Sequence, residues 1–136
     1  MKDSRLKYGY MTMGAFIVIV SSRLYVDMGY PLGIFYHGYM IHHIYYGIAI
    51  LLLSWFILAL TDYLCRDILD RFLSFMIGAG LGFIFDEINF IYYWRDYSFS
   101  DYSSFINIFA DLFLISVLLM LWKFPSPDTI SEEDIS

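Results

Sequence analysis

The sequence predicts an all-α, multi-pass membrane protein, a four-helix transmembrane bundle with short loops. Of its 136 residues, 60% are hydrophobic and only 16% are charged, which is more apolar surface than a soluble domain covers. No Asp, Glu, Lys or Arg occurs between Asp27 and Asp62. This stretch is longer than the roughly 20 apolar residues that cross a bilayer as a helix. Residues 44–60 also lack the polar stripe, repeating about every 3.6 residues, that a soluble amphipathic helix carries.

The first transmembrane helix is expected over about 8–26. Its residues are apolar through Val20 and then polar at Ser21, Ser22 and Arg23. Three basic residues precede it, as they would in a secretory signal peptide. No pair of small residues suited to cleavage follows, and a further apolar segment begins soon afterwards. We therefore expect the segment to remain in the protein as a helix.

Three further helices are expected over about 39–60, 72–94 and 105–122. A connection that contains Pro31 precedes the first of them, because proline interrupts a helix. A charged run at 62–71 marks a water-exposed turn between the second and third helices. Two prolines follow the last helix and end it.

These helices form one predicted domain, 1–124, followed by an acidic tail at 125–136 that we expect to be disordered. Six of the eight Lys and Arg residues lie before the first helix, between the second and third, or after the fourth. Cytoplasmic segments retain positive charge, so both termini are predicted to be cytoplasmic, in a protein of the cell membrane. The net charge of −6 argues against nucleic acid as a partner. Membrane lipids are the expected partners, and a homo-oligomer or a larger membrane complex remains open.

Several polar residues fall inside the predicted helices, where a charge near the bilayer centre costs roughly 2.5–3.5 kcal/mol. They are Arg23, His42, His43, Asp86, Glu87, Asn89, Asn107 and Asp111. With a rise of about 1.5 Å per residue, all of them come to lie in the outer half of the bilayer. The four helices are therefore predicted to contribute to one group of polar side chains.

Helical periodicity predicts which of these residues face the bundle. Gly78, Gly82 and Asp86 recur every four residues, and small residues let helices pack closely, so this face is expected to turn inward. His43 shares a comparable stripe of small residues on the second helix. Its neighbour His42 lies about 100° around a regular helix, so adjacent histidines are not expected to serve one ion.

The residue types predict a metal site. Two adjacent deep carboxylates need a proton, a cation or a metal, because mutual repulsion and desolvation oppose their charge. Imidazoles and carboxylates are ligands of zinc, iron and manganese, and helical bundles carry such sites. The predicted ligands are His42, His43, Asp86, Glu87 and Asp111, with Asp86 and Glu87 as catalytic residues. Arg23, Asn89, Asn107 and His37 are expected to support them. We expect Asp86 to lie within side-chain reach of His43, Arg23 or Asp111.

Three functions remain open. A metal-bound water could attack an ester or phosphoester bond of a lipid, which would make the chain a metal-dependent membrane enzyme. Alternatively, Arg23 neutralises Asp86 or Glu87, and the chain is a small accessory, scaffold or lipid-binding membrane subunit. A third alternative is an oligomeric transporter or proton-conducting protein. No HExxH, GxSxG, cysteine pair or glycine-rich phosphate loop selects a reaction, so the sequence leaves open whether the chain is an enzyme.

Overall fold

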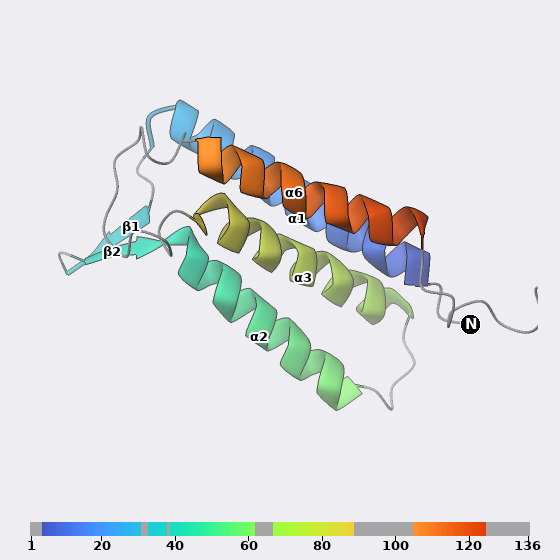
Figure 1. Cartoon of the computed structure of the whole chain (residues 1–136). Helices are drawn as coiled ribbons and strands as arrows, with labels where there is room; N and C mark the ends of the chain where they lie inside the picture. Colours follow the sequence, from blue (N-terminus) through green and yellow to red (C-terminus); the bar gives the residue numbers. More distant parts are fainter. Residues whose placement is uncertain (1–3, 31–32, 38, 62–66, 89–104, 125–136) are drawn as a thin grey trace, which may run out of the picture.

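The computed structural model describes residues 4–30, 33–37, 39–61, 67–88 and 105–124, and these ranges form four long helices and one β-hairpin. The elements in chain order are α1 (Ser4–Asp27), β1 (Gly33–Tyr36), β2 (Tyr39–His42), α2 (His43–Thr61), α3 (Asp67–Asp86) and α6 (Phe105–Lys123) (Figure 1). Each of the four helices is long and apolar enough to cross a membrane. The all-helical prediction thus holds for everything described except the hairpin.

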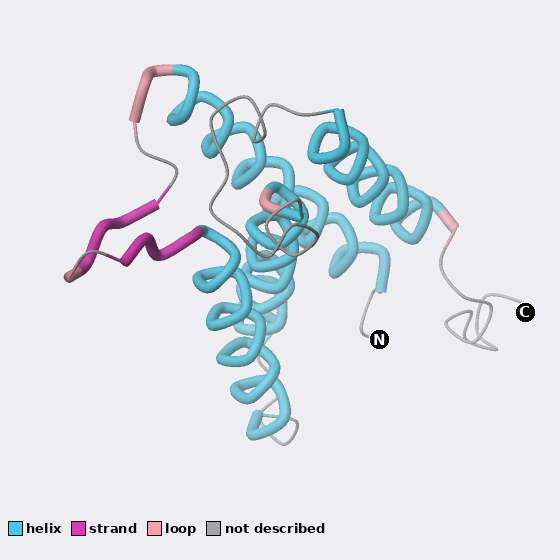
Figure 2. Tube along the Cα trace, turned by 60° about the vertical axis from the view of Figure 1, so that its left-hand side comes forward, coloured by secondary structure: helices cyan, strands magenta, loops and turns pink. Residues whose placement is uncertain are grey.

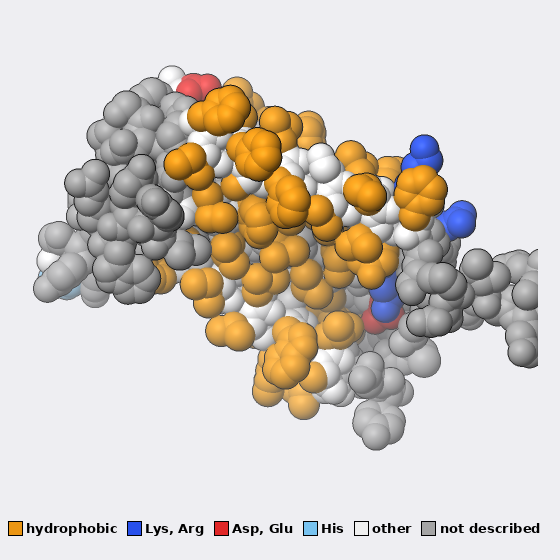
Figure 3. Space-filling view, viewed as in Figure 1, with side chains coloured by type: hydrophobic (Ala, Val, Ile, Leu, Met, Phe, Trp, Pro, Cys, Tyr) orange, Lys and Arg blue, Asp and Glu red, His pale blue; other side chains and the backbone are white. Residues whose placement is uncertain are grey.

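The helices run alternately up and down, so the molecule has two distinct ends (Figures 1 and 2). At the hairpin end, α1 finishes, the hairpin projects, α2 begins and α3 finishes. At the opposite end, which we call the terminal end, α1 begins and α6 finishes. Hydrophobic side chains cover the flanks of the helices between these ends, as Figure 3 shows for one face. Such a surface suits contact with lipid tails rather than with water.

The central helix is α3, which packs against α1, α2 and α6, whereas α2 packs chiefly on α3. Glycines make these contacts close. A β-carbon on Gly78 would collide with the backbone carbonyl of Met11 in α1, and one on Gly82 would lie 2.9 Å from the carbonyl of Ala15. On another face of α3, a β-carbon on Gly80 would lie 2.9 Å from the carbonyl of Gly47 in α2. The predicted inward face of α3 is confirmed, and a second glycine contact holds α2.

A small apolar core lies between α1 and α6, beside these glycine contacts. It consists of Ala15, Ile19, Leu114 and Leu118. These side chains recur every four residues on each helix, which places them on one face of it. The polar residues of interest lie beyond this core, toward the hairpin end.

The hairpin occupies the predicted start of the second helix, so the prediction of helix over 39–42 is wrong. β1 and β2 pair antiparallel, with Gly33 opposite His42 and Tyr36 opposite Tyr39. Between the strands, His37 adopts a φ of 49°, in the left-handed region where histidine is enriched among non-glycine residues. A short apolar run does not distinguish a strand from a helix by periodicity, and here tertiary context selects the strand.

The third helix begins at Asp67 and not at about residue 72, so part of the predicted charged turn is helical. Asp67 and Asp70 lie in the first turn of α3, where the positive end of the helix dipole favours carboxylates. The helix ends at Asp86, and the predicted continuation to residue 94 falls largely outside the described residues. The predicted acidic tail, 125–136, lies outside them as well.

Candidate functional site

Buried polar side chains gather at the hairpin end of the molecule. We call this group the polar cluster: Arg23, His42, His43, Asp86, Glu87, Asn107 and Asp111. Asp86 and Glu87 are fully buried, and His42 is almost so. The cluster draws on α1, β2, α2, α3 with the residue after it, and α6. The structure divides its charged members into two groups, one built around Arg23 and the other around Glu87.

The Arg23 group joins three helices through one guanidinium. Arg23 Nε of α1 lies 3.0 Å from Asp86 Oδ1 at the end of α3. Arg23 Nη2 donates a 2.7 Å hydrogen bond to Asp111 Oδ2 of α6. The guanidinium is planar and carries donors on several edges, so it can donate to two carboxylates in fixed directions. The prediction that Asp86 lies within reach of Arg23 is therefore confirmed.

The Glu87 group joins α3 to the start of α2. Glu87 Oε2 accepts a 2.9 Å hydrogen bond from the backbone N–H of Ile44. Glu87 Oε1 lies 3.5 Å from His42 Nδ1 and 3.9 Å from His43 Nδ1. Both imidazoles thus approach the same carboxylate oxygen, at separations longer than an ordinary hydrogen bond.

The ends of the helices explain why Glu87 can be buried there. The backbone N–H groups at the start of α2 have no partner within the helix, and its dipole presents positive charge to an anion. Glu87 uses both features through Ile44. At the end of α3 the dipole is reversed and disfavours a carboxylate. The Arg23 guanidinium offsets this unfavourable interaction for Asp86. The positive end of the α2 dipole offsets it for Glu87.

The change from strand to helix brings the two histidines together. His42 is the last residue of β2 and His43 is the first residue of α2. The expectation that they would not serve one ion assumed a regular helix through both residues, and that premise is wrong. Asp86 and Glu87, in contrast, contact different partners, Arg23 and the backbone N–H of Ile44.

The remaining predicted residues lie in different places. Asn107 is buried on α6, one turn before Asp111. His37 is exposed in the turn of the hairpin, in contrast to the buried cluster. Asn89 lies outside the described residues. No sequence pattern pointed to Ile44, because its role rests on its backbone N–H and not on its side chain.

The electrostatics of the cluster are unbalanced. Asp86, Glu87 and Asp111 carry three carboxylates, and Arg23 supplies one guanidinium. With neutral imidazoles and ionised carboxylates, two negative charges are left in a region shielded from water. Burying such charges is costly unless protons or a cation compensate them. In the described ranges, no group of three or more His, Cys, Asp or Glu side chains is arranged, as it stands, to hold a metal ion.

No family model matches the chain, and neither a curated protein nor a solved structure matches it. The function is therefore argued from the chemistry and geometry of the polar cluster.

Proposed function

We propose that the chain is a multi-pass protein of the cell membrane, that both termini face the cytoplasm, and that the polar cluster lies in the outer half of the bilayer. The distribution of basic residues supports this orientation. Arg5 and Lys7 lie near the start of α1, Arg71 lies near the start of α3, and Lys123 ends α6, all toward the terminal end. Arg23 lies toward the other end and is engaged by two carboxylates. Cytoplasmic surfaces retain positive charge.

We further propose that His42, His43 and Glu87 bind a divalent metal and that the chain is a metal-dependent membrane enzyme. The observation that carries this proposal is the approach of two imidazole nitrogens to one Glu87 oxygen, at 3.5 and 3.9 Å. Ligand atoms around one tetrahedral zinc ion lie about 3.4 Å apart, given bonds of about 2.1 Å. The separation of His42 Nδ1 from Glu87 Oε1 already matches this spacing, and that of His43 Nδ1 from the same oxygen is about half an ångström longer.

The donor set and the charge both favour a divalent ion. Two histidines and one glutamate are a ligand set of catalytic zinc sites, in which a fourth position remains for water. Iron and manganese accept the same ligand types. A doubly charged ion would also cancel the two excess negative charges of the polar cluster. The proposed ligand set is narrower than the one expected from the sequence, because Asp86 and Asp111 are engaged by Arg23.

The residues of the chain have defined tasks in this proposal. The N–H of Ile44 holds one oxygen of Glu87 and so directs the other toward the imidazoles. The His43 side chain keeps 14% of its surface exposed while Glu87 keeps none, so a substrate would approach past His43. A bound metal would supply an activated water at neutral pH. Lipids with ester or phosphoester bonds are the substrate class with direct access from the bilayer.

The scaffold alternative also has specific support. Arg23 already contacts both Asp86 and Asp111, and Glu87 already accepts a hydrogen bond from α2. These contacts connect α1, α2, α3 and α6 without any metal ion. In that case the polar cluster specifies helix packing, and the chain acts as a small accessory or lipid-binding subunit.

Metal analysis of detergent-purified protein separates the two functions. We expect near-stoichiometric zinc, iron or manganese after growth or dialysis with these metals. His43→Ala and Glu87→Gln should release it, whereas His37→Ala, which alters an exposed histidine of the hairpin turn, should retain it. A wild-type protein that stays metal-free after exposure to all three ions would rule out the metal-dependent enzyme and leave the scaffold and transport functions.

A further inference from the structure

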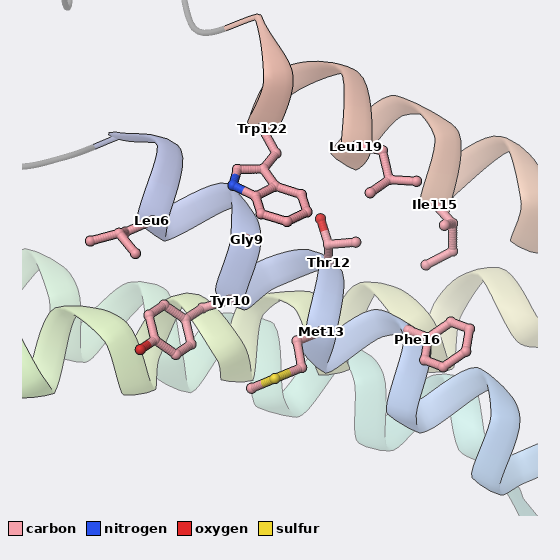
Figure 4. A pocket seen from close by; sticks show the side chains of 9 residues that line it. All are labelled: Leu6, Gly9, Tyr10, Thr12, Met13, Phe16, Ile115, Leu119 and Trp122. Carbon is pink, nitrogen blue, oxygen red and sulfur yellow. The ribbon is translucent and has the colours of Figure 1, made fainter.

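An apolar groove runs between α1 and α6 near the terminal end, away from the polar cluster. It has a volume of about 560 Å³, within the range of about 300–1,000 Å³ that is usual for small-molecule sites. Met13 and Phe16 line it along α1, and Ile115, Leu119 and Trp122 line it along α6 (Figure 4). The groove therefore follows the direction of the helices and offers an apolar path into the bilayer.

Gly9 and Trp122 shape the groove at its terminal end. The indole of Trp122 lies against α1 at Gly9, where an added β-carbon would lie 3.4 Å from Nε1, in van der Waals contact (Figure 4). The hydroxyl of Thr12 donates a 2.8 Å hydrogen bond to the carbonyl of Tyr8, which satisfies it within the helix. The middle of the groove thus suits a hydrocarbon chain. Trp122 suits the boundary between hydrocarbon and head groups.

Cationic side chains lie beside this end of the groove. Lys123 directly follows Trp122 and is exposed, with its Nζ 5.6 Å from the centre of the Phe124 ring. Arg5 is exposed one turn before Gly9. Figure 3 shows Lys and Arg side chains at the same end of the molecule. An apolar groove that ends beside two cations complements an anionic lipid, with its chain in the groove and its phosphate at the basic residues.

We propose that this groove binds one anionic phospholipid, with an acyl chain between α1 and α6 and the phosphate beside Lys123 and Arg5. The proposal rests on membrane insertion of the chain. It depends neither on the metal site at the other end nor on which membrane face is cytoplasmic. A lipid held there would contact both α1 and α6.

Native mass spectrometry tests this with protein reconstituted in an equal mixture of phosphatidylglycerol and phosphatidylcholine of the same chain composition. One phosphatidylglycerol should be retained per chain, at several times the occupancy of phosphatidylcholine. Lys123→Gln should remove most of this preference. Arg71→Gln, which changes an exposed basic residue of α3, should leave it unchanged.

Filling the groove should abolish retention of either lipid. Gly9→Leu and Leu119→Trp fill it from opposite helices, so one of them suffices if the other fails to fold. Ser21→Leu, a similar enlargement at an exposed position of α1 outside the groove, is the matched control and should retain the lipid. Equal retention of both lipids, or retention unaffected by the filling variants, would overturn the proposal. A dimer whose contacts include Trp122 would assign the groove to a second copy instead.

Discussion

Asp86 and Glu87 are neighbours in the sequence and both are fully buried, yet different groups compensate their negative charges. Asp86 faces a full positive charge, because Arg23 Nε lies 3.0 Å from it. Glu87 faces a backbone N–H at the start of α2 and two imidazoles whose charge can change. The Arg23 group is thus a fixed ion triad, whereas the Glu87 group can still accept protons or a cation. Adjacent acidic residues at a helix end need not share one task.

The two groups also join different parts of the fold. The Arg23 group connects α1, α3 and α6, which contribute the side chains of the apolar core and those packed against it. The Glu87 group connects α3 to the hairpin and to α2, which packs chiefly on α3. We therefore expect damage to the first group to appear as lost stability, and damage to the second as lost ligand binding.

Removing Arg23 should have the largest effect on stability. Arg23→Ala leaves Asp86 and Asp111 buried without their cation, and breaking a buried ion pair from one side costs about 3–5 kcal/mol. Equilibrium unfolding in mixed micelles of dodecyl maltoside and sodium dodecyl sulfate measures the free energy of unfolding. A triple variant that makes the whole triad apolar, Arg23→Met with Asp86→Leu and Asp111→Leu, should restore most of the loss. Failure of this triple variant to regain stability would show that the triad does more than satisfy its own charges.

Substitutions at the glycine contacts of α3 can alter the Arg23 group or the Glu87 group without changing a residue of either group. Gly78→Ala separates α3 from α1, and Gly80→Ala separates α3 from α2. Each overpacking change should cost about 1–3 kcal/mol. Gly78→Ala should keep metal bound, whereas Gly80→Ala should weaken it, because Glu87 meets the imidazoles across the contact of α2 with α3. Unfolding measured together with metal titration checks this pair, and equal effects of both variants on metal affinity would contradict the division into two groups.

Glu87→Gln should have a small effect on stability and a large one on metal binding. The amide oxygen still accepts from Ile44, so the cap is weakened and not lost, which should cost at most about 1 kcal/mol. The negative ligand is lost, so metal affinity should fall by more than roughly 100-fold, the upper range seen for changes that only support a ligand. A competition titration with a chromophoric chelator measures the affinity. Unchanged affinity in Glu87→Gln would remove Glu87 from the ligand set.

The least perturbing test compares the two ends of the molecule by labelling. In a chain with Cys65 replaced by serine, cysteines placed at Asp3 and Ser131 should be protected from an impermeant reagent outside intact cells. A cysteine at Ser98 should react, because α3 ends and α6 begins at the hairpin end. No change in stability is expected. Labelling at Ser131 without labelling at Ser98 would invert the proposed orientation and place the polar cluster in the cytoplasmic half.

The broad features of the fold follow directly from the sequence, because long charge-free stretches and the stripe of Gly78, Gly82 and Asp86 have few alternative explanations. The local errors have physical causes. The sequence does not identify the strand at 39–42, because a short apolar run fits the periodicity of a strand and that of a helix. It does not identify the start of α3, because Asp67 and Asp70 suit the first turn of a helix as well as a loop.

The composition of the cluster was also predictable, but its pairing was not. Ionisable residues at a common depth identified Arg23, His42, His43, Asp86, Glu87 and Asp111. Arg23 could have met either Asp86 or Glu87, and the choice depends on how α3 turns relative to α1, which single-sequence patterns do not determine. The partner of Glu87 on α2 is a backbone group, and no residue type marks such a donor.

The one-sided packing of α2 has a consequence for how the protein is made. α2 packs chiefly on α3, which follows it in the chain, so in the proposed membrane topology α2 enters the bilayer on its own apolar character. It contains no Asp, Glu, Lys or Arg, which permits such unaided entry. α1 and α3 carry Arg23 and Asp86, and each must enter with an uncompensated charge or wait for the other. In the proposed membrane topology, the order of helices thus places an independent helix between two that need each other, and the charges around Arg23 are matched only when α6 brings Asp111.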